Sequence, residues 1–118
     1  MQQNRITLVA GTDTRDPALV AAQAAARDAA IARALAAAHK GDAQALFDLG
    51  MVFAIGDAVV EIDLIEAHKW FNLAAVSGVC GAAQCRADVA DDMTAREIAE
   101  AQRRARAWLR TRPTSQVA

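Results

Sequence analysis

The chain has 118 residues, a formal net charge of −1 and 54% hydrophobic residues, and alanine alone fills 31 positions. This composition argues against intrinsic disorder, and it all but excludes an all-β fold because alanine favours helices and is poor in strands. The near-neutral charge argues against a general affinity for nucleic acids, and no apolar run approaches the ~20 residues that a membrane span requires.

Residues 1–15 precede the first strong helix signal, and they contain a short apolar run from Ile6 to Ala10. We expect them to form an N-terminal extension, either mobile or docked on the helical body. The apolar run is too short for the core of a signal peptide. Together with cysteines that do not demand an oxidising compartment, this predicts a cytoplasmic protein.

Five helices are predicted between residues 16 and 112, and residues 113–118 form a tail. Asp16 before Pro17 favours a helix start, since a residue before proline leaves the α region and proline suits the first helical position. Later starts are indicated by Asp42, by Asp63 with Glu66, and by Thr94 with Glu97, the last two pairs resembling capping boxes. The predicted helices span about 17–40, 43–55, 64–77, 81–91 and 95–110.

Apolar side chains at helical spacing predict the core. Leu49, Gly50 and Phe53 share one face of the helix over 43–55. Gly50 costs about 1 kcal/mol relative to alanine inside a helix, so we expect it to allow another backbone to approach closely. Trp70 and Phe71 lie on the stripe of the helix over 64–77 and are expected in the core.

No sequence pattern predicts catalysis, a metal site or a cofactor. The chain has no phosphate-binding loop, zinc-protease motif or nucleophile elbow. His39 and His68 have no ligand spacing with each other or with cysteines, and we expect both on the surface. Cys80 and Cys85 are five residues apart, which suits neither a redox pair nor zinc, so we expect both to be buried. The chain is therefore expected not to be an enzyme.

The chain also matches itself at a shift of 37 residues, a period that indicates a solenoid of helix pairs. Gly41 then aligns with Gly78, and Ala45 with Ala82. Helix pairs stack in such proteins because one hairpin cannot bury both of its apolar stripes. The fold predicted from these residues is all-α, a short α/α solenoid of about five helices.

The block from Gly41 to Ala82 resembles a Sel1-like repeat, a relative of the tetratricopeptide repeats. The matching positions of its first helix are Ala45, Leu49, Gly50, Phe53 and Gly56. Those of its second helix are Asp63, Ala67, Trp70, Ala74, Ala75 and Gly78. Ala58 departs from the pattern, since a second glycine is usual in that loop. The resemblance implies a protein–protein adaptor and supplies no catalytic residues.

Two surfaces are candidate binding sites. The side of the helix over 43–55 that faces away from its apolar stripe carries Gln44, Asp48, Met51, Val52 and Ile55. An exposed apolar pair, Met51 and Ile55, beside an acidic residue suits the apolar face of a partner helix or peptide. The alternative is that both side chains pack against the N-terminal extension or the first helix.

The second surface is the last helix, where Arg103, Arg106 and Arg110 align on one face. Such a row is commonly solvated, and its alternative roles are contact with RNA, DNA or an acidic protein surface. Because residues 41–78 carry six acidic residues and one lysine, the basic last helix could also dock on the acidic middle of a second copy. Homo-oligomerisation is therefore a third hypothesis, beside the adaptor and the nucleic-acid binder.

Overall fold

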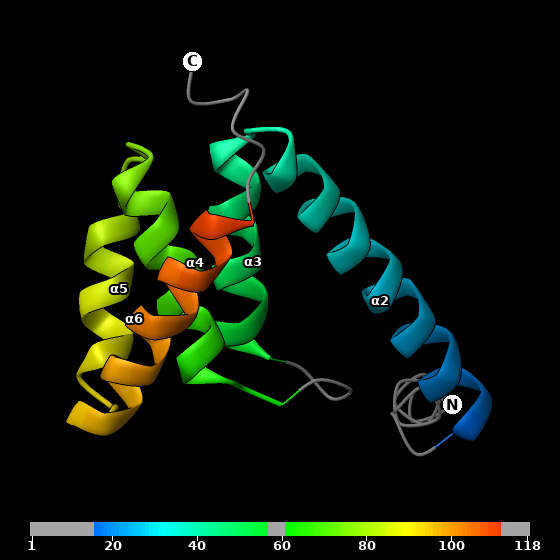
Figure 1. The fold of residues 1–118 in the computed structure, drawn as a ribbon. Helices are drawn as coiled ribbons and strands as arrows, with labels where there is room; N and C mark the ends of the chain where they lie inside the picture. The colour runs from blue at the N-terminus through cyan, green and yellow to red at the C-terminus, as the bar shows by residue number, and fades with distance from the viewer. Residues whose placement is uncertain (1–15, 57–60, 112–118) are drawn as a thin grey trace.

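The computed structural model describes residues 16–56 and 61–111, and every regular element in these two ranges is an α-helix (Figure 1). The helices are α2 (Pro17–His39), α3 (Ala43–Ile55), α4 (Leu64–Val76), α5 (Ala82–Ala90) and α6 (Ala95–Arg110). The prediction of an all-α fold is confirmed. The ranges predicted for α3 and α6 coincide with the structure, those for α2 and α4 extend one residue too far at the C-terminal end, and that for α5 extends one residue too far at both ends. The predicted extension 1–15 and tail 113–118 lie outside the described residues.

Side-chain caps fix where most helices begin. Carboxylate oxygens of Asp16, Asp42 and Asp63 accept backbone N–H bonds at the starts of α2, α3 and α4. At the start of α6, the Thr94 hydroxyl accepts from the Glu97 N–H at 3.1 Å, and the Glu97 carboxylate accepts from the Thr94 N–H at 2.8 Å. This reciprocal pair is the capping box that the sequence predicts. α5 instead begins after Gly81, whose φ of +85° favours glycine, with no side-chain cap.

α4 is the central helix of the bundle: it packs against α3, α5 and α6, while α2 packs against α3. Trp70 and Phe71, which the sequence places in the core, are both buried. Gly50 is also buried on α3, and a Cβ added there would lie 2.5 Å from the Phe71 Cδ1 atom. The expected close approach at Gly50 is therefore made by an aromatic ring of α4 and not by another backbone.

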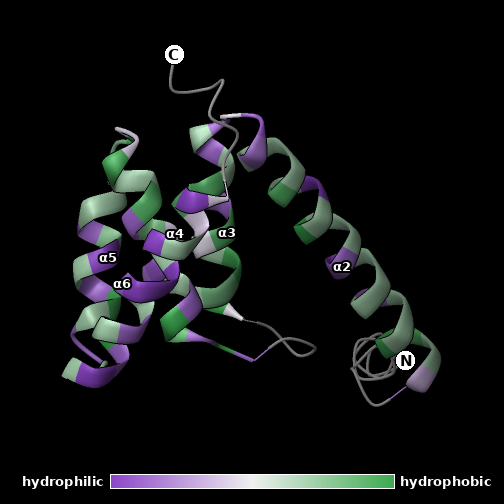
Figure 2. Cartoon of the chain, viewed as in Figure 1, coloured by the Kyte–Doolittle hydropathy of each residue, from purple (hydrophilic) through white to green (hydrophobic). Residues whose placement is uncertain are grey.

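α2 approaches the bundle only near its C-terminal end and diverges from it toward its N-terminus (Figure 1). Ile31, Ala34 and Leu35 pack against the core, and Ala38 is buried in it. No side chain of α2 before Ile31 is buried. Figure 2 shows that hydrophobic residues continue along this diverging part, most of them alanines. None of the helices in the described ranges combines the length and the apolar character needed to cross a membrane.

Candidate partner-binding surfaces

The predicted binding residues of α3 lie on one side of the helix, and together they are called the α3 outer face: Gln44, Asp48, Met51, Val52 and Ile55. Ile55 is 63% exposed, and Met51 and Val52 are half-buried. At the other end of the face, the exposed Gln44 donates a hydrogen bond from Nε2 to Asp48 Oδ1 at 3.2 Å. The face therefore has an apolar half toward the end of α3 and a polar half toward its start.

The apolar half of the α3 outer face forms one wall of a depression of about 240 Å³. Met51, Val52 and Ile55 line it from α3, and Arg27 lines it from α2. α2 thus covers part of this surface, as the alternative interpretation of the sequence allows, but Ile55 stays exposed. Gln44 and Asp48 do not line the depression.

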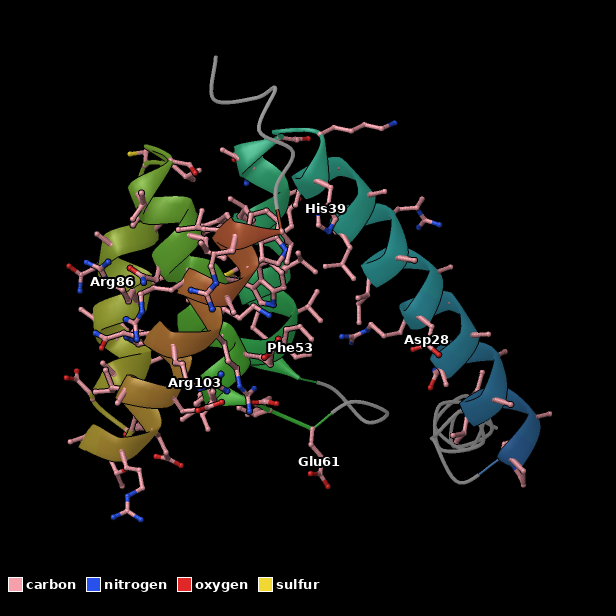
Figure 3. All side chains as sticks on the ribbon, viewed as in Figure 1. Asp28, His39, Phe53, Glu61, Arg86 and Arg103 are labelled. Carbon is pink, nitrogen blue, oxygen red and sulfur yellow. The ribbon has the colours of Figure 1, made fainter. Side chains whose placement is uncertain are left out.

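A second hollow, which the sequence analysis did not find, lies where four helices meet. This groove of about 310 Å³ is called the wedge groove. Its apolar lining consists of Ile31 and Leu35 of α2, Leu49 and Phe53 of α3, Trp70 of α4 and Trp108 of α6. Figure 3 shows His39 and Phe53 on the sides of their helices that face the space between α2 and the bundle. The groove was missed because its residues come from separate stripes, which sequence periodicity assigns to the core.

The two tryptophans form one side of the wedge groove. Their ring centroids are 5.6 Å apart in an edge-to-face arrangement with an interplanar angle of 78°. The His39 ring lies 5.2 Å from Trp108 at the end of α2. These ring contacts link α2, α4 and α6, and both tryptophans are buried, at 3% and 9% exposed.

Glu66 connects the helices at the polar edge of the wedge groove. Its Oε1 accepts hydrogen bonds from Trp70 Nε1 at 3.1 Å and from Lys69 Nζ at 3.3 Å. Its Oε2 accepts from Arg104 Nη1 of α6 at 2.8 Å. The Lys69 ammonium also lies 4.1 Å from the centroid of the Trp70 ring. The sequence suggested a capping role for the Glu66 side chain, and the structure shows that it orders this edge of the groove.

The predicted arginine row on α6 is partly engaged in ion pairs. Arg103 donates from Nε and Nη2 to Glu100, at 2.9 and 2.6 Å, and Arg104 Nε donates to the same carboxylate at 2.7 Å. Hydrogen bonds from Arg103 and then Arg104 lower the pKa of Glu100 to about 2. Arg106 and Arg110 are exposed. The row thus presents two exposed side chains and one that is held against its own helix.

His68 was expected on the surface, and this prediction is wrong. It is a buried residue of α4, with 4% of its surface exposed. Burial and, secondarily, the positive charge of Arg86 lower the pKa of His68, because both disfavour the imidazolium. Arg86 itself donates a hydrogen bond of 2.6 Å to Asn72 Oδ1, which connects α5 to α4.

The cysteine prediction is also wrong in part. Cys80 is exposed in the turn before α5, and Cys85 is half-buried. Both thiols are free. Cys80 is exposed because it belongs to the turn between α4 and α5, which ends at Gly81, and not to either helix.

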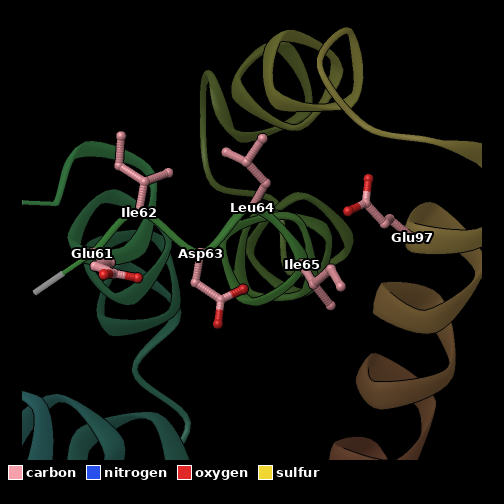
Figure 4. Close-up of a pocket in the computed structure, with 6 residues that line it drawn as sticks. All are labelled: Glu61, Ile62, Asp63, Leu64, Ile65 and Glu97. Atoms are coloured by element: carbon pink, nitrogen blue, oxygen red, sulfur yellow. The ribbon is translucent and has the colours of Figure 1, made fainter.

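An acidic depression of about 390 Å³ lies at the end of the bundle where α4 and α6 begin (Figure 4). Glu61, Asp63 and Glu97 contribute carboxylates, and Ile62 and Ile65 contribute apolar side chains. Asp63 and Glu97 are already used as helix caps. Over the described ranges, no cluster of three or more His, Cys, Asp or Glu side chains could hold a metal ion.

Comparison of the chain with models of protein families, with curated proteins and with solved structures found no match.

Proposed function

We propose that this protein is a binding module, a short solenoid of Sel1-like helical hairpins that holds a segment of a partner protein on the α3 outer face. The partner segment is an amphipathic helix or peptide whose apolar side chains contact Met51, Val52 and Ile55. Asp48 and Arg27 lie beside this apolar surface and supply charges of both signs for orienting the segment.

The observation that carries this proposal is the exposure of Ile55. An isoleucine that is 63% exposed, next to two half-buried aliphatic side chains in a depression, extends an apolar surface into solvent. Contiguous apolar surface of this kind is typical of interaction sites. Single exposed side chains are ordinary on protein surfaces, and it is the grouping with Met51 and Val52 that matters here.

The hairpin of α3 and α4 supports the repeat architecture. Phe71 of α4 sits against Gly50 of α3, at positions that belong to the matched block, and α4 then packs against α5 and α6. Each further pair of helices would thus cover the apolar stripe of the pair before it. α2 takes the place of the second helix of a preceding, shortened unit.

Affinity capture with quantitative mass spectrometry tests the proposal. The native chain is compared with Ile55→Asp and with the pair Met51→Asp and Ile55→Asp. Ile55→Asp alone changes a mostly exposed side chain, so it is expected to leave the fold intact. A partner bound on the α3 outer face should be lost with both variants, and its dissociation constant should rise by about tenfold or more.

Val76→Asp is the matched control, because Val76 is 72% exposed at the end of α4 and outside the α3 outer face. It introduces the same apolar-to-acidic change elsewhere on the surface. Proteins lost with the Ile55 variant and kept with the Val76 variant support the proposal. If every captured protein binds all variants equally, or if the control loses the same proteins, the α3 outer face is not the binding surface.

A further inference from the structure

Four large hydrophobic side chains are exposed in the described part of the chain: Ile55, Ile62, Val76 and Leu109. Ile55 belongs to the α3 outer face, and the other three lie outside the proposed partner site. A single exposed apolar side chain is ordinary on a protein surface. Ile62 and Leu109, however, each lie among charged side chains of one sign, and the two signs are opposite.

Ile62 is part of the acidic depression. It is 57% exposed, and it lines the depression together with Ile65 and three carboxylates. Figure 4 shows Glu97 reaching from α6 toward Ile65 at the start of α4. Asp63 and Glu97 each use one carboxylate oxygen to cap a helix, which leaves further acceptor sites on both groups. Glu61 is exposed. The depression therefore suits a surface that is basic and carries an apolar side chain.

The last turn of α6 is such a surface, and it is called the basic end of α6: Arg106, Leu109 and Arg110. Leu109 is 43% exposed, and both arginines are exposed. Spacings of three and four residues from Arg106 place all three side chains on one side of the helix. Every exposed charged residue of α6 is an arginine, so no exposed carboxylate of this helix offsets their charge. The acidic depression and the basic end of α6 are thus complementary in charge, and each has an exposed aliphatic side chain.

The two surfaces lie at opposite ends of α6 and do not meet within one chain. Leu109 follows Glu97 by 12 residues, which is about 18 Å along the helix axis at 1.5 Å per residue. Arg106 follows Glu97 by nine residues, which is two and a half turns, so the two side chains also point to opposite sides of the helix. Surfaces that differ in both end and side favour a head-to-tail contact, in which one copy presents one surface and the next copy presents the other.

We propose that the basic end of α6 docks in the acidic depression of a second copy of this chain. Leu109 contacts Ile62 and Ile65, and the two arginines donate hydrogen bonds to the carboxylates of the depression. A second copy is the occupant because the described part of the chain itself carries the complementary surface. This gives a specific form to the homo-oligomerisation hypothesis drawn from the sequence, and it is independent of the proposed partner site.

The proposed contact is small and charged, so the association should be weak, concentration-dependent and sensitive to salt. Each docked pair still presents an acidic depression at one end and a basic end of α6 at the other. A head-to-tail contact of this kind continues to add copies unless the rotation between them closes a ring. The native chain should therefore form species larger than a dimer at high concentration.

Analytical ultracentrifugation of the full chain tests the association. A reductant is present throughout, because Cys80 is exposed and could link copies by a disulfide. At about 10 mM salt, where the screening length is about 30 Å, the average mass should rise above 12.5 kDa with protein concentration. At about 1 M salt, where the screening length is about 3 Å, it should fall toward the mass of one chain. A monomer at every concentration in low salt overturns the proposal.

One substitution, made at each of the four exposed apolar side chains, locates the contact. Ile62→Asp and Leu109→Asp should each raise the dissociation constant by about tenfold or more. Ile55→Asp and Val76→Asp make the same change outside the two surfaces and should leave it unaltered. Equal weakening by all four variants, or by none, overturns the proposal.

A further variant does not depend on the packing of Leu109. Arg106→Ala with Arg110→Ala removes two exposed charges, and circular dichroism checks that the helix content of each variant is retained. This variant should also raise the dissociation constant by about tenfold or more in low salt. Native-like association without the two arginines overturns the proposal, whatever the outcome for Leu109→Asp.

Mixing two variants separates a head-to-tail contact from any other. Ile62→Asp keeps an intact basic end of α6, and Leu109→Asp keeps an intact acidic depression. Each variant alone should stay monomeric. Their mixture should form a pair of twice the mass of one chain and grow no further, because both remaining surfaces of the pair are altered. A mixture that stays monomeric, under conditions in which the native chain associates, overturns the proposal.

Discussion

Arg104 of α6 donates a hydrogen bond from Nη1 to Glu66 Oε2 of α4 at 2.8 Å, joining two side chains that are 38 positions apart in the chain. The same glutamate accepts from the indole N–H of Trp70, which is 3% exposed. The Glu66 carboxylate therefore accepts a hydrogen bond from the nearly buried indole N–H of Trp70. At the same time it forms an ion pair that joins α4 to α6. The stability of the fold should therefore be sensitive to the loss of the Glu66 carboxylate.

We expect Glu66→Ala to lower the free energy of unfolding by about 1–3 kcal/mol, because Trp70 Nε1 loses its acceptor and Arg104 loses its partner on α4. Urea denaturation followed by circular dichroism measures the change. Arg103→Ala is the matched control: its ion pair with Glu100 lies within α6 and its side chain is 61% exposed, so the loss of stability should be much smaller than that of Glu66→Ala. Equal losses in the two variants would contradict the role given to Glu66.

Gly50→Ala should destabilise the protein although alanine is the better helix former. The new Cβ would lie 2.5 Å from Cδ1 of Phe71, a ring that is 1% exposed, so the ring or the helix would have to shift. We expect a loss of about 1–3 kcal/mol from this overpacking, measured by thermal or urea unfolding.

The variant Phe71→Leu provides the test of mechanism for this contact. In the double variant the smaller side chain relieves the clash, so the combined loss should be less than the sum of the two single losses. Additive losses would show that Gly50 matters for a reason other than its contact with Phe71. A gain in stability from Gly50→Ala alone would contradict the prediction outright.

The helices of this protein are predictable from its sequence because their signals are local. Asp16, Asp42 and Thr94 each cap a helix through backbone groups two or three residues away, so a short stretch of sequence contains the whole interaction. The burial of Trp70 and Phe71 follows from helical periodicity in the same way. These features do not depend on how the helices are placed relative to one another.

The features that the sequence did not reveal are those that depend on the packing of separate helices. His68 lies on a face of α4 that looks polar in sequence, yet it is 4% exposed in the packed bundle and close enough to Arg86 of α5 for that charge to act on it. The wedge groove exists only because α2 diverges where α3, α4 and α6 meet. The hydrogen bond from Arg104 to Glu66 belongs to the same group, since it joins α6 to α4. The three hydrogen bonds that Arg103 and Arg104 donate to Glu100 lie within α6, and their spacing of three and four residues was a usable signal that the sequence analysis did not use.

Glu100 should remain ionised in the folded protein down to a pH of about 2, where its pKa lies. Its pKa is lower in the folded state than in the unfolded state. The ion pairs with Arg103 and Arg104 are therefore fully present above about pH 4.5 and are lost as the pH falls toward 2. Carboxyl chemical shifts in an NMR titration measure the pKa directly. Arg103→Ala should raise it most and Arg104→Ala next, whereas Arg106→Ala should leave it unchanged. A pKa near 4.5 in the native chain would refute these contacts.

His68 should make the stability of the protein depend on pH in the mildly acidic range. Its pKa is lowered in the folded state, so the unfolded chain binds a proton more readily. The free energy of unfolding is then highest above pH 6.5 and falls as the pH drops below it, by at most about 1.4 kcal/mol per pH unit for one proton. Urea denaturation between pH 7.5 and pH 5 measures this slope. His68→Leu should reduce it. A slope that persists in His68→Leu would assign the effect to another group.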